Sequence, residues 1–177
     1  YETEVFKGVV EMERSNIAER SSKLFPFSGI YSASKNLIDL EKNKKIDQHV
    51  NLVSLFWDTI GDNMDQWRGV RIGNLSATEV RRDYIHTHVI ILQALGMAGK
   101  DLMSQFPNNW KTKIKNLKKI NWLKNNSEWH QRVIVNGRVV KNSNSIILAA
   151  NLIKKALGAR LSVKEKALES KMKKNVK

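Results

Sequence analysis

The apolar residues of this sequence recur at intervals of three and four positions, and this spacing limits the fold more than any other feature. The clearest series is Ile46, Val50, Val53, Phe56, Trp57 and Ile60. Such a series places one apolar stripe along an α-helix, whereas a half-buried β-strand would need alternation at every second residue. A chain of 177 residues has the length of one domain with its own core. We therefore expect a mainly α-helical fold, a single compact multi-helix domain.

The N-terminal part of the sequence predicts further segments around this helix. Asn16 and Glu19 have the spacing of a capping box, in which two side chains satisfy free backbone N–H groups at the start of a helix. Further along, apolar residues again recur on one helical face, and these are Phe27, Ile30, Tyr31, Leu37 and Ile38. Residues 41–47 predict a charged, exposed connection, and residues 61–73 predict a loop that Trp67 anchors.

The central part of the sequence predicts the main core helix. Ser76 and Glu79 form a second capping-box pair, and the helix that starts there extends to about Gly96. Its middle, residues 89–92, is apolar on all sides, so we expect this helix to be buried. Another helix is predicted over about residues 108–123.

The last third of the sequence predicts a turn and two helix boundaries. Asn136–Gly137 is flanked by Val133 and Val135 on one side and by Val139 and Val140 on the other, which is the pattern of a short β-hairpin. A helix over residues 146–157 stops at Gly158, a typical helix-end residue. Ser162 and Glu165 form a third capping-box pair, and we expect the lysine-rich residues after them to fray.

The positive charge of the chain is confined to its C-terminal part. The formal net charge is +14; residues 1–70 hold 9 basic against 11 acidic side chains, and residues 71–177 hold 22 against 6. A charge excess confined to one segment predicts a polyanionic partner, and DNA, RNA and an anionic membrane all fit this chemistry. The longest nearly apolar stretch, Val89–Gly99, is too short to span a bilayer. The absence of cysteine excludes disulfides and cysteine-based metal or redox sites.

Basic residues gather in and after the predicted helix at residues 108–123. At about 100° per residue, Trp110, Ile114 and Leu117 share an apolar face, and four lysines fall on an arc of about 100° beside it. The helix can therefore dock by its apolar face and present ammonium groups to phosphates. A solvated lysine face is the alternative, but acidic residues that would balance it are almost absent nearby. The residues that we predict to bind DNA are Lys111, Lys115, Lys118, Lys119, Lys124, Arg132, Arg138 and Lys141.

The remaining motifs do not indicate catalysis. His86 and His88 are two positions apart on a predicted helix and point about 200° from each other, so they cannot share a metal ion. Trp110, Trp122 and Trp129 have side chains that can stack on unpaired bases, but tryptophans at this spacing are more often core residues, which we expect here. No nucleophile–base pair and no paired carboxylates are recognised. We therefore expect no enzyme activity, no catalytic residue, no metal and no cofactor.

Several short motifs, in their order along the chain, resemble a known family. They are Glu11–Ser15, Arg20–Phe25, Ser28–Tyr31, Phe56–Trp57, Arg81–Ile85, Asn121–Trp122, Gly137–Arg138 and Leu157–Gly158. This set extends over about residues 10–165 and resembles the DndB family of DNA sulfur modification proteins, within the wider DGQHR-domain family. The Asp-Gly-Gln-His-Arg motif of the wider family is absent, and Asn121 stands where the family pattern has Asp.

The resemblance implies a DNA-binding transcriptional repressor of a bacterial DNA phosphorothioate modification gene cluster. Such a protein acts in the cytoplasm, and its partners are DNA and other DNA sulfur modification proteins. We expect no association with a membrane, and whether the chain forms a homo-oligomer is left open. We assign residues 1–170 to a helical DNA-binding domain and residues 171–177 to a basic tail. Because the first residue is Tyr1 rather than Met, we expect a C-terminal fragment of a larger protein. The alternative is a protein-interaction module that docks onto other modification proteins, with DNA binding or catalysis in the missing N-terminal part.

Overall fold

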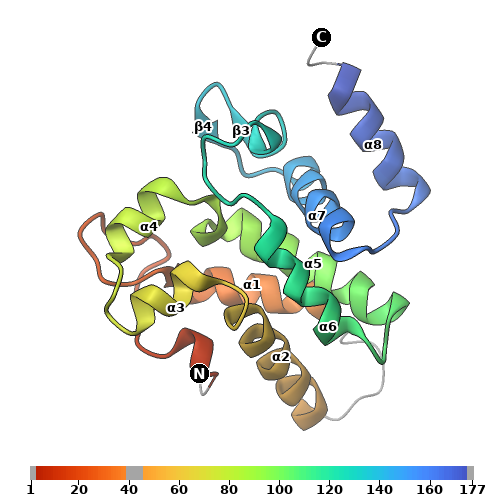
Figure 1. Ribbon diagram of the computed structural model, residues 1–177. Helices are drawn as coiled ribbons and strands as arrows, with labels where there is room; N and C mark the ends of the chain where they lie inside the picture. The colour runs from red at the N-terminus through yellow and green to blue at the C-terminus, as the bar shows by residue number, and fades with distance from the viewer. Residues whose placement is uncertain (1–2, 39–45, 175–177) are drawn as a thin grey trace.

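The computed structural model describes residues 3–38 and 46–174, and α-helices dominate this part of the chain (Figure 1). The α-helices are α1 (Phe27–Leu37), α2 (Ile46–Gly61), α3 (Asp65–Arg71), α4 (Ala77–Asp83), α5 (Val89–Gln105), α6 (Trp110–Ile114), α7 (Ser143–Leu157) and α8 (Val163–Lys174). The short 3-10 helices are η1 (Glu4–Phe6), η2 (Ile85–Thr87), η3 (Lys115–Lys119) and η4 (Ser127–Trp129). Two small sheets pair β1 (Val10–Glu11) with β2 (Phe25–Pro26) and β3 (Ile134–Val135) with β4 (Arg138–Val139). The prediction of a mainly α-helical fold is confirmed.

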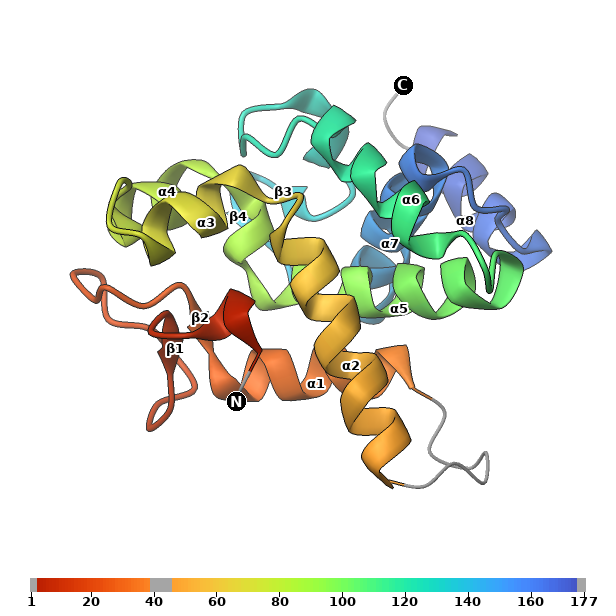
Figure 2. The same cartoon turned by 60° about the horizontal axis from the view of Figure 1, so that its bottom comes forward.

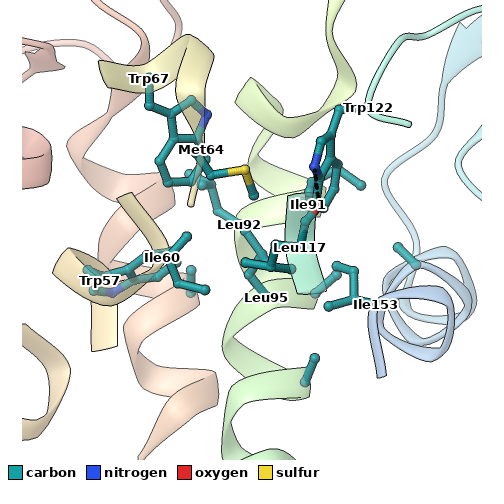
Figure 3. Packing of buried hydrophobic residues seen from close by; sticks show 14 of the residues in the cluster. Trp57, Ile60, Met64, Trp67, Ile91, Leu92, Leu95, Leu117, Trp122 and Ile153 are labelled. Atoms are coloured by element: carbon teal, nitrogen blue, oxygen red, sulfur yellow. Dashed lines mark hydrogen bonds between the residues drawn. The ribbon is translucent and has the colours of Figure 1, made fainter. Parts of the chain in front are cut away.

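Helix α5 is the centre of the hydrophobic core. The apolar segment predicted to be buried opens this helix, and Ile91 and Leu92 are both 0% exposed. Helix α1 packs against one side of α5 and α7 packs against another (Figures 1 and 2). Figure 3 shows Leu95 of α5 between Ile60 of α2 and Ile153 of α7. The predicted burial of this helix is confirmed.

Two glycines on α5 allow its neighbours to approach closely. A Cβ atom at Gly96 would lie 2.2 Å from the backbone oxygen of Ala33 in α1. A Cβ atom at Gly99 would lie 2.3 Å from Cε2 of Phe56 in α2. Both separations are far shorter than van der Waals contact, so a larger residue at either position would force the helices apart.

The prediction of one helix over residues 76–96 is wrong, because the chain forms α4, η2 and α5 in its place. Tyr84 is extended, with φ −110° and ψ 139°, and pairs with Leu123 in an isolated antiparallel bridge. The backbone N–H of Ile85 donates to the carbonyl oxygen of Trp122 at 2.9 Å. Backbone pairing with a distant segment therefore overrides the local preference for a continuous helix.

The predicted start of that helix is correct even though its end is not. The Ser76 Oγ atom accepts a hydrogen bond from the backbone N–H of Glu79 at 3.5 Å and so caps α4. Helix α5 continues to Gln105, beyond the predicted end at Gly96. The helix continues through its two glycines because both pack closely against neighbouring helices, where a side chain would not fit.

The predicted loop at residues 61–73 contains a helix. Helix α3 occupies most of it and turns Trp67 into the core, where this side chain is 1% exposed. The predicted anchoring role of Trp67 is therefore confirmed, although the loop is wrong. The predicted connection at residues 41–47 lies mostly outside the described residues, which resume at Ile46 with α2.

The helix predicted from the Asn16 capping box does not form. The guanidinium of Arg81 in α4 donates to the carbonyl oxygen of Ser21 at 2.7 Å and to that of Ala18 at 3.3 Å. It also donates to the carbonyl oxygens of Glu19 and Lys23. These carbonyl groups find their hydrogen-bond partner across the fold, so the segment needs no helix to satisfy them.

The predicted hairpin at Asn136–Gly137 is confirmed. Strands β3 and β4 are antiparallel, with Val135 opposite Arg138. Both turn residues have positive φ, 50° at Asn136 and 72° at Gly137, which is the backbone of a type I′ turn. Asparagine and glycine adopt this conformation more readily than other residues, and this preference explains why the sequence signal is reliable.

Helix α7 also ends where the sequence predicts. Gly158 has φ 76° and follows the last helical residue, Leu157. The helix begins three residues before the predicted position 146, because the side chain of Asn142 accepts a hydrogen bond from the Ser145 N–H at 2.9 Å. This side-chain cap satisfies an N–H group that would otherwise lack a partner.

Helix α8 replaces the frayed segment that the sequence predicts. The capping box is complete, since the Ser162 N–H donates to Glu165 at 2.8 Å and the Glu165 N–H donates to Ser162 Oγ at 3.3 Å. The helix continues to Lys174, through the predicted boundary at residue 170. No helix in residues 3–38 and 46–174 is long and apolar enough to cross a membrane.

Buried ion pairs attach α8 to the rest of the molecule. Lys154 of α7, whose side chain is 1% exposed, pairs with Asp101 of α5 and Glu165 of α8. Glu169 of α8 accepts from Arg132 at 3.0 Å in a two-bond contact. Because Arg132 precedes the hairpin, these pairs link α8 to two separate parts of the fold.

Replacing Gly96 by alanine should weaken the packing of α1 on α5. The added Cβ would meet the Ala33 carbonyl, so we expect the free energy of unfolding to fall by about 1–3 kcal/mol. Urea denaturation measures this change, with the exposed Ser104→Ala in the same helix as the matched control. A Gly96→Ala variant as stable as the control would show that the two helices do not approach as closely as described.

The carboxylate of Glu169 should make stability depend on acid pH. Burial alone would raise its pKa, but hydrogen bonds from Arg132 and Lys155 outweigh burial and lower the pKa from 4.5 to about 2. Its stabilisation is therefore complete above about pH 4.5 and is lost as the pH falls towards 2. A Glu169→Gln variant should be about 3 kcal/mol less stable at neutral pH, because Arg132 loses its partner.

The test is a series of urea denaturations of the wild type and Glu169→Gln between pH 7 and pH 2. We expect the difference in unfolding free energy between the two proteins to shrink steadily below about pH 4.5. A difference that is the same at every pH would contradict the ion-pair attachment of α8.

Candidate nucleic-acid interface

Helix α6 and the following η3 present a row of lysines to solvent. The predicted apolar face is confirmed, since Trp110, Ile114 and Leu117 are buried. The predicted α-helix to residue 123 is wrong in its second half, because the chain tightens into the 3-10 helix η3 and ends at Lys119. The buried positions are spaced by four and then by three, which matches this change of helix type.

We name the exposed row the basic ridge, which consists of Lys111, Lys115, Lys118 and Lys119. Lys118 lies 3.7 Å from the Asp65 carboxylate of α3, and both side chains are more than half exposed. Within the described part of the chain, the other three lysines have no carboxylate within 4.0 Å. A weak, exposed ion pair at Lys118 leaves most of the charge of the ridge uncompensated.

The charges of Lys124 and Lys141 both act on His88. The Lys124 ammonium donates to the carbonyl oxygen of Arg81 at 2.8 Å, and burial lowers the pKa of Lys124 while Asp83 opposes this. Burial, followed by the charges of Lys124 and Lys141, lowers the pKa of His88 from 6.5 to about 4. His88 is therefore neutral at pH 7, and the local charge belongs to the two lysines.

The two predicted arginines have different environments. Arg138 is exposed at the start of β4, beside the rigid Asn136–Gly137 turn. Arg132 is directed inward, where it pairs with Glu169 and donates to the carbonyl oxygen of Leu148 at 3.2 Å. A guanidinium held by a buried carboxylate is largely neutralised, and this pair attaches α8 to the segment before the hairpin.

The structure adds two lysines that the sequence analysis missed. Lys155 of α7 and Lys173 of α8 line a cavity of about 440 Å³ together with Lys119 of the ridge. Arg132 and Glu128 also line this cavity. These residues come from separate elements, so no local pattern could have placed them together. Lys173 extends the positive surface from η3 towards α8, whereas the ammonium of Lys155 pairs with the Glu169 carboxylate.

The tryptophans of this region belong to the core, as predicted. Trp129 is 0% exposed and stacks on Trp122, with ring centroids 5.4 Å apart. The indole N–H of Trp122 donates to the carbonyl oxygen of Leu117 at 3.2 Å (Figure 3). Trp110 is also buried, and the Lys111 ammonium lies 5.7 Å from its ring centroid. Buried rings cannot stack on bases, so the exposed cationic groups of this region are its lysines and arginines rather than its tryptophans.

Of the two histidines near the start of α5, His86 lies in the core and His88 is half-buried. The indole N–H of Trp67 donates to His86 Nδ1 at 2.9 Å, and the His86 side chain is fully buried. Burial, with a smaller effect from His88, lowers the pKa of His86 to about 3 and keeps the ring neutral. Among the described residues, no group of three or more His, Cys, Asp or Glu side chains could hold a metal ion.

The fold and its charges define a helical domain with an exposed cationic surface and a tryptophan-rich core. A family model described as DndB: DNA-sulfur modification-associated matches residues 1–160. The chain belongs to this family, which confirms the resemblance seen in its motifs and associates the protein with DNA sulfur modification. The match ends before α8. No curated protein and no solved structure matches the chain.

Removing the charge of Lys141 should raise the pKa of His88. The pKa of His88 is lowered mainly by burial and in part by Lys124 and Lys141, so a Lys141→Gln variant should have a value above about 4 but still below 6.5. NMR titration of the His88 ring proton measures this value. Lys164→Gln, an exposed charge removal on α8, is the matched control. Equal His88 values in Lys141→Gln and wild type would show that Lys141 does not face His88.

Proposed function

We propose that this domain binds DNA and represses a bacterial gene cluster for DNA phosphorothioate modification. The basic ridge carries the proposal, because its charge is exposed and, among the residues that the structure describes, only Lys118 of the ridge has a carboxylate within 4.0 Å. The family association with DNA sulfur modification favours DNA over RNA or an anionic membrane as the polyanion. The protein would act in the cytoplasm, where the DNA is, and would need no catalytic residue or cofactor.

The ridge suits contact with a phosphate backbone. Its apolar face is fixed in the core by Trp110, Ile114 and Leu117, so the lysines are presented from a rigid support. Lysine acts as a point charge, and each phosphate that it neutralises releases condensed counterions. Binding through the ridge alone would therefore be strong at low salt and weakly selective for sequence.

Selectivity needs a group that reads base edges. Arg138 is the best placed candidate, because it is exposed beside the type I′ turn of the hairpin and arginine can form two hydrogen bonds with guanine. Lys124 and Lys141 would add phosphate contacts. Arg132 is excluded from the proposed contacts, since it pairs with the buried Glu169.

A protein-docking module is a second candidate, and a different surface favours it. A cavity of about 660 Å³ lies between α1 and α2, and the exposed apolar side chains of Tyr31, Ile46 and Val50 line it. Apolar side chains that remain exposed together often mark a contact with another protein. In this candidate, other DNA sulfur modification proteins would be the partners, and the basic ridge would be a solvated surface.

Neutralising the ridge distinguishes the two candidates. The variant carries Lys111→Gln, Lys115→Gln, Lys118→Gln and Lys119→Gln, and the measurement is duplex DNA affinity at several salt concentrations. We expect lower affinity, and a plot of log K against log salt that is flatter by roughly 3 to 4 units of slope, because four phosphate contacts are lost.

The control variant removes the same charge from α8, with glutamine at Lys164, Lys166, Lys171 and Lys174, all of which are exposed. It should retain most of the affinity and slope, which separates a local contact from the effect of net charge. If the ridge variant binds DNA as the control does, or if neither wild type nor control binds at low salt, the proposal fails and the docking module is favoured.

A further inference from the structure

A second positively charged site lies beside the loop that Arg81 holds. A cavity of about 280 Å³ is lined there by segments far apart in the sequence. Its lining residues include Ser15 and Asn16 of the loop, Thr87 at the end of η2, His88 just before α5, and Lys141 before α7. Members of the basic ridge do not line it, so it is separate from the ridge.

The positive charge of this cavity has no acidic partner among its lining residues. Arg81 donates to four backbone carbonyls and, at 3.4 Å, to the hydroxyl of Thr78, all of them neutral groups. Lys141 is exposed and, in the part of the chain that the structure describes, has no carboxylate within 4.0 Å. Asp83, the acid whose charge acts on Lys124, is itself paired with Arg82 at 2.8 Å. Arg81 and Lys141 therefore line the cavity without a carboxylate partner among the described residues, and the terminal N–H groups of Arg81 are bound by carbonyl oxygens.

Arg81 also builds the wall of the cavity. Its bonds to the carbonyls of Ala18, Glu19, Ser21 and Lys23 fix the loop that carries Ser15 and Asn16. Partial burial lowers the pKa of Arg81, although the side chain remains charged at any ordinary pH. A guanidinium that is partly desolvated exerts a stronger field than one in bulk water.

The lining combines charged, neutral polar and apolar groups. The hydroxyl of Ser15, the amide of Asn16 and the imidazole of His88 can donate hydrogen bonds, whereas the Thr87 hydroxyl donates to the carbonyl oxygen of Tyr84 at 3.3 Å. Leu24, Pro26 and Val89 form an apolar part of the wall. Neutral donors around one or two cations, with water partly displaced by apolar atoms, are what a tetrahedral oxyanion needs.

We propose that this cavity binds a single phosphate group. Its volume of about 280 Å³ lies just below the roughly 300–1,000 Å³ of pockets that hold drug-sized ligands, so it suits a small anion or one phosphoryl end of a larger molecule. The phosphate belongs either to a DNA backbone or to a free phosphate ester. Only the first source rests on the proposed DNA-binding function.

The test is a titration of the full chain with inorganic phosphate, with chloride at matched ionic strength as the reference. The NMR signal of the His88 ring proton reports on the cavity directly. We expect a saturable shift whose dissociation constant is about tenfold weaker in Lys141→Gln, because one charged hydrogen bond is lost. Lys141→Arg should restore binding, and Lys164→Gln on α8 should bind as the wild type does. A shift that does not saturate, or an equal loss in Lys164→Gln, would overturn the proposal.

The same titration with a duplex bound identifies the source of the phosphate. If the cavity takes a backbone phosphate, saturating duplex abolishes the response of His88 to inorganic phosphate. If it takes a free phosphate ester, the response persists with the duplex bound. Both results support the phosphate site. Failure of the chain to bind any duplex would count against the proposed function alone, because the phosphate response needs no DNA.

Discussion

The burial of residues 89–99 of α5, all of which are buried or half-buried, is the constraint on which the rest of the structure depends. Its glycines at positions 96 and 99 let α1 and α2 approach within contact distance, and its other side receives α7. Once α5 is enclosed, α6 and η3 can only place their apolar residues inward and their lysines outward. The exposed charge is thus a consequence of how the core is filled, and it is held on a rigid support.

The basic side chains of the C-terminal part of the chain have two different roles. Lys154 and Arg132 are directed inward and pair with acids, so their charges attach α8. The ridge lysines, together with Lys124 and Lys141, keep charges that no buried acid in residues 3–38 and 46–174 neutralises. The large net positive charge is therefore not spread evenly: part of it stabilises the fold, and the remainder is available to a polyanion.

The sequence predicted correctly those turns and helix ends that depend on residues close together in the chain. The Asn136–Gly137 turn, the Gly158 helix end and the Ser162 cap depend on residues within one turn, and all three are correct. The failures involve distant partners: Tyr84 is extended because it pairs with Leu123, and the loop around residue 19 is held by Arg81. The candidate site follows the same rule. The exposed ridge was predictable from helical spacing, whereas the pairing of Arg132 with Glu169 was not.

The central claim is that this domain binds DNA through uncompensated surface charge. The most direct test is a titration of the wild-type chain with duplex DNA at several salt concentrations, using both the promoter of the modification genes and an unrelated duplex. The account predicts binding that weakens steeply with salt, as counterion release requires, and that is tighter for the promoter. Absence of binding to either duplex at low salt would contradict it.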